Sequence, residues 1–496
     1  MRQAAMNSWD IISQVRERAK EELGALRVQA PLRIALCYPS QYSIGMSSLG
    51  FQTIYREIHL HPGAAAERAF LPDDTEAHRR LRLPVFTYET ETPLGSFPVI
   101  AFSVSYELEI AGLLEMLDLS GIPPLRADRG KRHPLVVAGG PLTFSNPLPL
   151  APFVDLILLG EGEELIHTFL DAATAGDRED LLRRFAALPS CFVPGRTAVL
   201  PAIAKAGAAR LPARSQILTR NTVLSSMFMI EPERGCSRGC TYCVMRRTTN
   251  GGMRLVTPEK VLSLVPEHAV RVGLVGAAVT DHPKIKDVVR AIVESGRGIG
   301  ISSLRADRLS DELVELLRSG GYRTLTTASD GASQRLRDAV QRRTSEKHLI
   351  RAAELAHKYK YEQLKLYEMI GLPDETLADI DELARFCLEL ARITPVSLAI
   401  SPFVAKRNTP LDGAPFEPIP SLDKKLATLR SRLKNKVEIR STSARWAWVE
   451  YMLAQGGEDA GMAALEAWRT GGAFAAWKRA FRIAPSHRDA QGAPRR

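Results

Sequence analysis

Residues 234–243 read Arg-Gly-Cys-Ser-Arg-Gly-Cys-Thr-Tyr-Cys, which places Cys236, Cys240 and Cys243 in a C-x3-C-x2-C pattern. Thiolates bind soft metals, and cysteine is the usual ligand of iron–sulfur clusters. Three cysteines are one short of the four that close a structural zinc site or an ordinary electron-transfer cluster. The spacing therefore predicts a metal centre with one position left open for chemistry. The two glycines of the loop allow the backbone to wrap closely around such a centre.

The chain has three other cysteines. Cys387 lies on an apolar helical face and is expected to be a small buried core residue, and Cys37 ends an apolar run that is typical of a strand. Cys191 stays open as a distant fourth ligand, although nothing beside it resembles a ligand pair. The alternative for the C-x2-C pair is a zinc or redox site. A fourth cysteine close to the trio would support that alternative.

The cysteine run, with Tyr242 directly before its third cysteine, resembles the motif of the radical S-adenosylmethionine (SAM) superfamily. The resemblance implies that the three thiolates hold a 4Fe–4S cluster whose fourth iron is chelated by SAM. It also implies a 5′-deoxyadenosyl radical that abstracts a hydrogen atom, and an electron donor such as flavodoxin or ferredoxin. Because an exposed carbon radical would be quenched, the site is expected to be closed to water.

The composition predicts a globular protein of two or three domains, with 496 residues of which 45% are hydrophobic. The net charge is +10, which is compatible with RNA or another anionic partner. No dense basic run accompanies this charge, and an arginine-rich proteome would produce the same balance. A nucleic-acid partner is therefore unsupported by any motif.

The sequence has no apolar stretch of the roughly eighteen residues that a membrane span needs. Residues 1–30 show an amphipathic pattern interrupted by charges, which predicts a helix and not a signal peptide. Few cysteines and an oxygen-sensitive cluster indicate a reducing environment. We therefore expect a cytoplasmic protein.

Residues 31–195 alternate short apolar strands with helical patterns, which predicts an α/β fold with a parallel sheet and helices on both faces. Ligands on such sheets bind at the carboxyl ends of the strands. Small and glycine-rich segments fall at those ends. The candidate cofactor contacts there are Ser103, Ser105, Gly139, Gly140, Gly160, Glu161 and Gly162.

Two of these segments, residues 138–147 and 155–164, resemble the cobalamin-binding domain that precedes many radical SAM cores. The resemblance implies a Rossmann-like cobalamin-binding-type domain and cobalamin as a further cofactor. Many such domains carry D-x-H-x-x-G after the first strand, with the histidine beneath cobalt. Residues 40–50 occupy that place without a histidine, so a bound cobalt would lack a histidine lower ligand. The alternative is a nucleotide-binding-like fold that has lost cobalamin.

The remaining chain is expected to form a linker, a barrel and a helical cap. Residues 196–225 are rich in Ala, Pro, Arg and Gly and predict the linker. Residues 226–440 show repeated strand–helix units with about six strands, and the resemblance implies a partial (β/α)6 radical SAM barrel. Residues 441–496 hold four of the five tryptophans and predict a small helical cap against the barrel, with a flexible tail. Stacking of a substrate on these tryptophans is the alternative role.

The superfamily resemblance also implies SAM contacts at the carboxyl ends of the barrel strands. Residues 276–281 match a glycine-rich motif without its glutamate, so Gly276 and Ala277 would meet the SAM amino group through backbone only. Arg305 is a candidate partner of the SAM carboxylate, or an ordinary surface arginine. The other candidates are Tyr242, Asp330 in place of a longer glutamate, Ser333 (which could instead cap the next helix), and Ile370 and Gly371 against adenine.

The leading hypothesis is a radical SAM enzyme of the cobalamin-dependent methyltransferase type, which transfers a methyl group to an unactivated carbon. A first alternative keeps the radical core without methylation, as a rearrangement or a modification of RNA or a cofactor. A second alternative is a non-catalytic iron–sulfur or zinc protein that binds a partner. No motif identifies the substrate.

Overall fold

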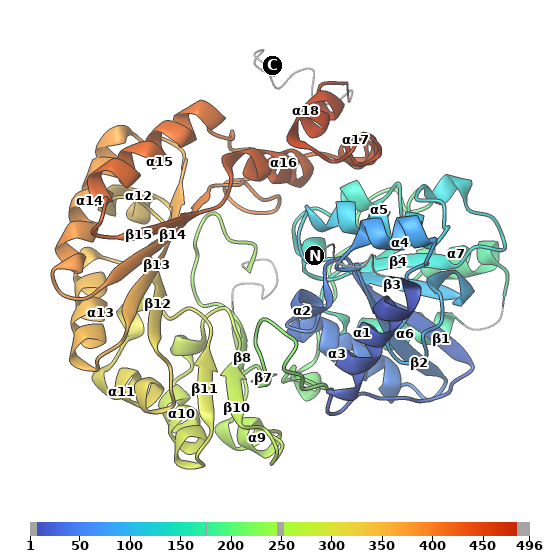
Figure 1. Cartoon of the computed structure of the whole chain (residues 1–496), viewed down its shortest axis with the longest axis horizontal. Helices are drawn as coiled ribbons and strands as arrows, with labels where there is room; N and C mark the ends of the chain where they lie inside the picture. The colour runs from blue at the N-terminus through green and yellow to red at the C-terminus, as the bar shows by residue number, and fades with distance from the viewer. Residues whose placement is uncertain (1–6, 174–175, 246–251, 484–496) are drawn as a thin grey trace. The chain divides into compact units, whose positions relative to one another are not determined.

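The computed structural model describes residues 7–173, 176–245 and 252–483 (Figure 1). The chain divides into two compact units. We call Met1–Ser226 together with Gly456–Arg496 the sheet unit, and Met227–Gln455 the barrel unit. Across the described ranges, every helix is too short or too polar to cross a lipid bilayer.

The sheet unit is built on six strands in the order β2-β1-β3-β4-β5-β6. All neighbours pair in parallel except β5 and β6, which are antiparallel. The strands are β1 (Leu32–Tyr38), β2 (Ala64–Phe70), β3 (Val99–Ser103), β4 (Leu135–Gly139), β5 (Leu156–Leu158) and β6 (Cys191–Phe192). The order of the first five is that of flavodoxin-like doubly wound sheets. The predicted α/β fold is therefore confirmed.

Helices pack on both faces of this sheet, as the parallel strands require. They are α1 (Ser8–Lys20), α2 (Tyr42–Gly45), α3 (Leu49–Leu60), α4 (Thr75–Leu81), α5 (Glu109–Leu119), α6 (Gly162–Ala172) and α7 (Arg178–Ala186). Helix α3 packs beside α6, and α5 packs beside α4. A side chain on Gly112 of α5 would collide with the Pro39 carbonyl, so α5 approaches the loop after β1 closely.

The segment expected to be a linker, residues 196–225, is bonded into the sheet unit instead. The Gln52 side-chain oxygen accepts the amides of Gln216 and Ile217, both at 2.9 Å. Ala204 forms a parallel bridge at the carboxyl end of β5. The prediction failed because a Pro- and Gly-rich composition does not reveal which strand ends will pair with the backbone of the segment.

The barrel unit is a curved row of parallel strands. They are β7 (Met227–Ile230), β10 (Arg271–Leu274), β11 (Gly298–Ile301), β12 (Thr324–Ala328), β13 (Gln363–Ile370), β14 (Val396–Pro402) and β15 (Glu438–Ser441). Two sheets, β11-β10-β7 and β12-β13-β14-β15, are joined by a bridge between Leu304 and Thr327. The predicted partial barrel is confirmed, with β15 as one parallel strand beyond the expected six.

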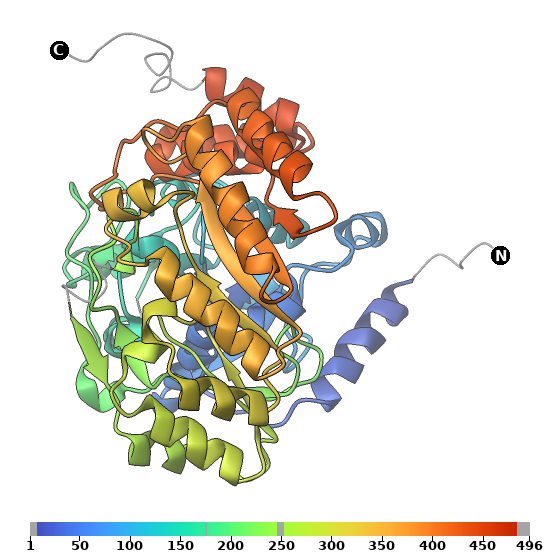
Figure 2. The same ribbon diagram turned by 90° about the vertical axis from the view of Figure 1, so that its left-hand side faces the viewer.

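Helices follow the barrel strands and cover their outer face. They are α9 (Pro258–Ser263), α10 (Ile285–Glu294), α11 (Asp311–Ser319), α12 (Gln334–Ala339), α13 (Glu346–Lys358), α14 (Leu377–Ala391) and α15 (Ile419–Leu433). Figure 2 shows several of them in front of the strands. Between β7 and β10 a small antiparallel hairpin of β8 (Glu233–Gly235) and β9 (Met253–Leu255) flanks the cysteine loop.

The C-terminal helices do not form one cap on the barrel. Helix α16 (Ala444–Gln455) packs on β14 and α15, but α17 (Glu458–Arg469) and α18 (Phe474–Ile483) belong to the sheet unit. Trp468 of α17 donates its indole N–H to Glu115 of α5 at 2.8 Å. Gly461 approaches the Pro149 carbonyl so closely that a side chain there would collide with it. The tryptophan-rich pattern predicted the helices correctly, but not the surface on which α17 packs.

Candidate functional site

The three motif cysteines lie in the loop that follows β8. Cys240 is 5% exposed, and Cys236 and Cys243 are partly buried. The Arg238 amide donates to the Cys236 sulfur at 3.4 Å. Burial raises the pKa of the Cys236 and Cys243 thiols, and the nearby Cys240 raises both further. The three sulfurs therefore share one local environment, as thiolates that bind the same cluster must.

This environment fits a 4Fe–4S cluster. Among the described residues, no three His, Cys, Asp or Glu side chains are placed to hold a single metal ion. A cluster does not need that arrangement, because each thiolate binds a different iron atom. A backbone N–H directed at a sulfur, as from Arg238 to Cys236, is one of the contacts that tune iron–sulfur clusters.

A fourth cysteine ligand has no support in the described part of the barrel unit. Cys387 of α14 is fully buried. Burial raises the pKa of its thiol, and its charged neighbours are Glu368 and Arg337. Cys37 and Cys191 lie within β1 and β6 of the sheet unit. The Cys387 thiol thus belongs to the core of the barrel unit, and the open position at the trio stays a prediction.

Glu233 supports the loop after β10. This residue was not among the site residues predicted from the sequence. Glu233 is fully buried, and its Oε1 accepts the Ala278 amide at 2.9 Å. A side chain on Gly276 would collide with the same oxygen, and Ser302 donates its hydroxyl to the Gly276 carbonyl at 3.0 Å. Ala277 lies exposed at the tip of this loop. Glycine is thus required where the loop meets the carboxyl group.

The pKa of the buried Glu233 carboxyl group is strongly raised. Burial raises its pKa to about 7, and its second oxygen has no hydrogen-bond partner among the described residues. A signal was present in the sequence, since an acidic residue in a strand that leads into a metal-binding loop is unusual. That signal is insufficient for a prediction, because a single glutamate does not belong to a motif with a fixed spacing.

The Arg305 guanidinium is already paired with carboxylates of the chain and is not available to the SAM carboxylate. It is 6% exposed, and its guanidinium pairs with Asp281 through Nη1 and with Asp307 through Nε at 3.2 Å and Nη2 at 2.6 Å. Arg238 of the cysteine loop also pairs with Asp307, and Ser237 donates to Asp281 at 2.7 Å. Arg305 therefore supports the cysteine loop through two carboxylates, which corrects the predicted role. Sequence alone did not show that both carboxylates would reach it.

Two further candidates, Tyr242 and Asp330, meet directly. The Tyr242 hydroxyl donates to the Asp330 carboxylate at 2.8 Å, and Arg342 pairs with the same oxygen at 3.0 Å. Burial and the Asp330 carboxylate raise the pKa of Tyr242, so its hydroxyl stays protonated. Asp330 adopts a left-handed backbone with φ of 58°. The loop after β12 is thus tied to the cysteine loop through one carboxylate.

Ser333 serves as a helix cap. Its hydroxyl accepts the Leu336 amide at 3.3 Å and donates to Asp379 at 2.6 Å. It is completely buried. The alternative stated for Ser333 is therefore the one observed, and its role as a SAM contact is corrected.

Ile370 and Gly371 end β13 in different ways. Ile370 is fully buried on the same face as Leu364 and Leu366, so its side chain belongs to the core and not to an adenine surface. Gly371 turns the chain with φ of 84° and donates its amide to Glu375 at 2.8 Å. The buried Lys425 binds Glu375 in turn. The loop after β13 is thus rigid, and Gly371 is the residue that permits its turn.

The carboxyl end of β5 in the sheet unit is covered by the chain itself. The Ala204 amide donates to the Leu159 carbonyl at 2.8 Å, and the Glu161 amide donates to the Ala204 carbonyl at 3.1 Å. A side chain on Gly160 would lie 2.5 Å from the Ala204 backbone. The Glu161 carboxylate accepts the Ala206 amide at 2.7 Å. Gly160 and Glu161 therefore hold a segment of the chain, which corrects their predicted role as cofactor contacts.

The serines at the end of β3 are also close to other groups of the sheet unit. The Ser105 hydroxyl bonds to the Tyr38 hydroxyl at 2.8 Å, and the Ser105 amide donates to Glu109 at 2.6 Å. Ser103 is 9% exposed at the last position of the strand. Ser105 thus links the end of β1 with the start of α5, at the place where the strand order reverses.

The predicted glycines at the carboxyl ends of β4 and β5 differ in what they do. Gly140 has φ of 101°, and a side chain there would lie 2.7 Å from the Val104 carbonyl. A side chain on Gly162 would lie 2.6 Å from Ile54, so this glycine lets α3 and α6 approach. Gly139, by contrast, has room for ordinary contact at the end of β4. Turning and close packing thus account for Gly140 and Gly162 but not for Gly139.

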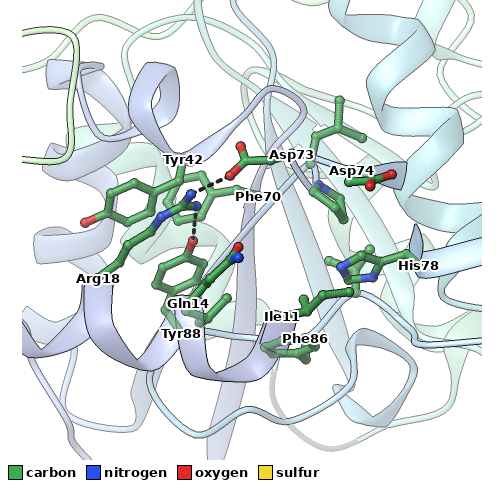
Figure 3. A pocket seen from close by; sticks show the side chains of 14 residues that line it. Ile11, Gln14, Arg18, Tyr42, Phe70, Asp73, Asp74, His78, Phe86 and Tyr88 are labelled. Atoms are coloured by element: carbon green, nitrogen blue, oxygen red, sulfur yellow. Dashed lines mark hydrogen bonds and ion pairs between the residues drawn. The ribbon is translucent and has the colours of Figure 1, made fainter. Parts of the chain in front are cut away.

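One cavity of the sheet unit lies apart from these loops, between α1 and the loop after β2 (Figure 3). Its volume is about 90 Å³, well below the roughly 300 Å³ of the smallest usual ligand pockets. Arg18 pairs with Asp73 at 2.5 Å and approaches the Tyr88 hydroxyl at 3.5 Å beside it. The cavity is therefore too small for SAM or a corrinoid.

Comparison with known proteins bears on the two units separately. Residues 230–387 match the radical SAM superfamily, and residues 50–194 match the family described as radical SAM proteins, N-terminal. The uncharacterized protein MJ0966 of Methanocaldococcus jannaschii is 24% identical over 444 residues, which are 86% of this chain and 89% of that protein.

Solved structures of OxsB, a cobalamin-dependent S-adenosylmethionine radical enzyme, resemble the chain at the level of fold. The form with aqua-cobalamin has a TM-score of 0.52 at 14% identity, over 72% of this chain and 52% of that one. The form with aqua-cobalamin and S-adenosylmethionine has a TM-score of 0.51 at 14% identity, over 82% and 56%. The chain thus spans about half the length of OxsB. The barrel unit therefore resembles the radical SAM superfamily over residues 230–387, and the sheet unit resembles the N-terminal family of radical SAM proteins over residues 50–194.

Proposed function

We propose that this protein is a radical SAM enzyme and abstracts a hydrogen atom from an unactivated carbon of its substrate. The observation that carries the proposal is the cysteine trio, whose three sulfurs share one environment beside the carboxyl ends of the barrel strands. When bound, the 4Fe–4S cluster supplies one electron that splits SAM into methionine and the 5′-deoxyadenosyl radical. A donor of the flavodoxin or ferredoxin class returns that electron.

The protein's part in this chemistry is to hold and to position. Cys236, Cys240 and Cys243 would bind three irons and leave the fourth for SAM. The loop at Gly276 and Ala277 presents exposed backbone, and the buried Glu233 keeps that loop in place. A rigid support of this kind holds reacting groups in geometry without reorganisation during the reaction.

Cobalamin-dependent methyl transfer is the second candidate. It is favoured by the flavodoxin-like strand order and by the fold that the chain shares with OxsB. The predicted contacts do not fit a corrinoid, however, because Gly160 and Glu161 hold residues 204–206 and Ser105 bonds to Tyr38. We therefore derive no step through cobalamin. A non-methylating rearrangement, or modification of RNA or a cofactor, is the alternative that needs no corrinoid contacts.

The test is anaerobic purification followed by single-turnover assays. The protein as isolated is analysed for iron and for corrinoid absorbance, then incubated with SAM and dithionite. We expect bound iron and 5′-deoxyadenosine, with no S-adenosylhomocysteine whether or not cobalamin is added. Absence of 5′-deoxyadenosine from iron-loaded protein would refute hydrogen abstraction. Corrinoid binding with formation of S-adenosylhomocysteine would establish the second candidate instead.

A further inference from the structure

The chain places an arginine beside the most buried cluster ligand. Cys240 is 5% exposed, and its sulfur lies 3.8 Å from the Gln341 carbonyl, one residue before Arg342. The Thr241 amide donates to the Val340 carbonyl at 3.1 Å, so residues 340–342 run along the cysteine loop. Contacts of Cys240 and Thr241 with residues 340 and 341 therefore help to position Arg342 beside the cysteine loop.

Among the described residues, Arg342 forms one ion pair, with the Asp330 carboxylate. Its Nε lies 3.0 Å from the Asp330 carboxylate, and its Nη2 donates to the Ala328 carbonyl at 3.3 Å. A guanidinium stays protonated in folded proteins, so Arg342 carries a positive charge. Asp330 and Cys240 are among its electrostatic neighbours. The guanidinium is thus permanently charged beside a cluster sulfur.

The carboxylate is held just as firmly. Asp330 has a left-handed backbone with φ of 58°, a conformation that aspartate adopts more often than most residues. The Tyr242 hydroxyl donates to it at 2.8 Å, from the residue adjacent to Cys243. One positive and one negative group are therefore fixed between two of the three cluster cysteines.

Both charges act in a poorly solvated place. The side chains of Arg342 and Asp330 are 14% and 17% exposed. Charges interact several times more strongly there than in bulk water. Net charge, hydrogen bonds to sulfur and solvent exposure set the reduction potential of an iron–sulfur cluster. Reduction adds one negative charge, which a nearby cation stabilises and a nearby anion opposes.

We propose that the Arg342–Asp330 pair sets the reduction potential of the cluster, with Arg342 raising it and Asp330 lowering it. The inference deepens the proposed function and rests on it only for the presence of the cluster. One electron passes from a low-potential donor (dithionite in the assay) to the cluster, and no bond is made or broken in that step. The two residues are positioning residues that act through the cluster and its thiolates.

The experiment is a redox titration of the anaerobically purified full chain, followed by electron paramagnetic resonance. Arg342→Gln leaves the Asp330 charge unbalanced, so we expect the midpoint potential to fall. Asp330→Asn leaves the guanidinium unbalanced, so we expect it to rise. Tyr242→Phe keeps both charges and should move the potential less than either variant. Arg342→Lys, which retains the charge, should return the potential toward the wild-type value.

The neighbouring Arg343 provides the matched control, because it is exposed and carries the same charge. Arg343→Gln should leave the potential close to that of the wild type. Shifts of the same sign in Arg342→Gln and Asp330→Asn, or no shift in either, would overturn the inference while leaving the proposed function intact. A chain that binds no iron at all would overturn both. Iron content of each variant separates a change of potential from loss of the cluster.

Discussion

The barrel unit and the sheet unit both end parallel strands in short loops rich in small residues, but these loops have different partners. In the barrel unit, Gly276 and Asp330 lie in loops that contact the residues around the cysteine trio. In the sheet unit, Gly160 and Ser105 contact other parts of the same unit. Small residues at strand ends therefore indicate close approach, and whether a ligand or the chain itself approaches is a separate question.

The largest effect should come from substitution of the cysteine trio, which the strand-end loops of the barrel unit surround. We expect Cys240→Ala to abolish iron binding and 5′-deoxyadenosine formation, beyond the roughly 100-fold loss that follows removal of an outer-shell partner. Cys37→Ala, in β1 of the sheet unit, is the matched control and should retain both. Iron analysis and product quantification measure the difference. Retention of a full cluster in Cys240→Ala would break the comparison.

The buried Glu233 should make the stability of the barrel unit depend on pH. Burial raises its folded pKa from 4.5 to about 7, so the native state holds its proton at pH values where the unfolded state has lost it. Stability relative to Glu233→Gln should therefore be highest below about pH 4.5 and should fall by about 3 kcal/mol as pH rises to about 7.

Thermal unfolding of both proteins across that range measures this dependence. Equal pH profiles for the wild type and Glu233→Gln would show that the carboxyl group is not buried as described. Glu294→Gln, at the exposed end of α10, provides a control of the same chemical change.

One glycine substitution in each unit compares the two units directly. Gly276→Ala forces a side chain against Glu233, and Gly160→Ala forces one against Ala204. Overpacking of this kind costs about 1–3 kcal/mol, so both variants should unfold at lower temperature. Gly276→Ala should also weaken SAM binding, whereas Gly160→Ala should not. Gly130→Ala, where no atom lies within 4 Å of the added carbon, is the control for both. Equal losses of SAM affinity in Gly276→Ala and Gly160→Ala would contradict the assignment of SAM binding to the barrel-unit loop alone.

The smallest effect should come from Ser333. Its loss as a helix cap in Ser333→Ala should cost about 1 kcal/mol, with SAM affinity unchanged. Calorimetric unfolding and equilibrium binding of SAM separate the two roles. A loss of SAM affinity larger than the loss of stability would restore Ser333 as a cofactor contact.

Much of the fold was predictable because periodicity and strand–helix alternation are local signals. The parallel sheet of the sheet unit and the partial barrel both follow from short apolar runs separated by amphipathic helices. The strand β15 and the attachment of α17 to α5 were not predictable in this way. They depend on pairings between segments far apart in the chain, for which a single sequence has no spacing rule.

The residues of the candidate site also differ in how well the sequence predicted their roles. Residues with a spacing, such as the cysteine trio, were identified correctly as one group. Residues chosen singly, such as Arg305, Ser333 and Ile370, proved to serve an ion-pair network, a helix cap and the core. Glu233 and Arg342 were missed because neither belongs to a spaced pattern. Their importance arises from burial next to the Gly276 loop and next to Cys240.

The sequence by itself predicted the cysteine trio, because three thiols spaced within eight residues lie near one another in whatever loop the segment forms. It also determined the two α/β architectures, since hydrophobic periodicity dictates which faces must be buried. Only the tertiary structure decided which carboxylates and guanidiniums surround those thiols. It also decided that residues 204–206 cover the end of β5. Charge pairing and strand-end bridging act between distant segments, so their outcome appears only once the chain has folded.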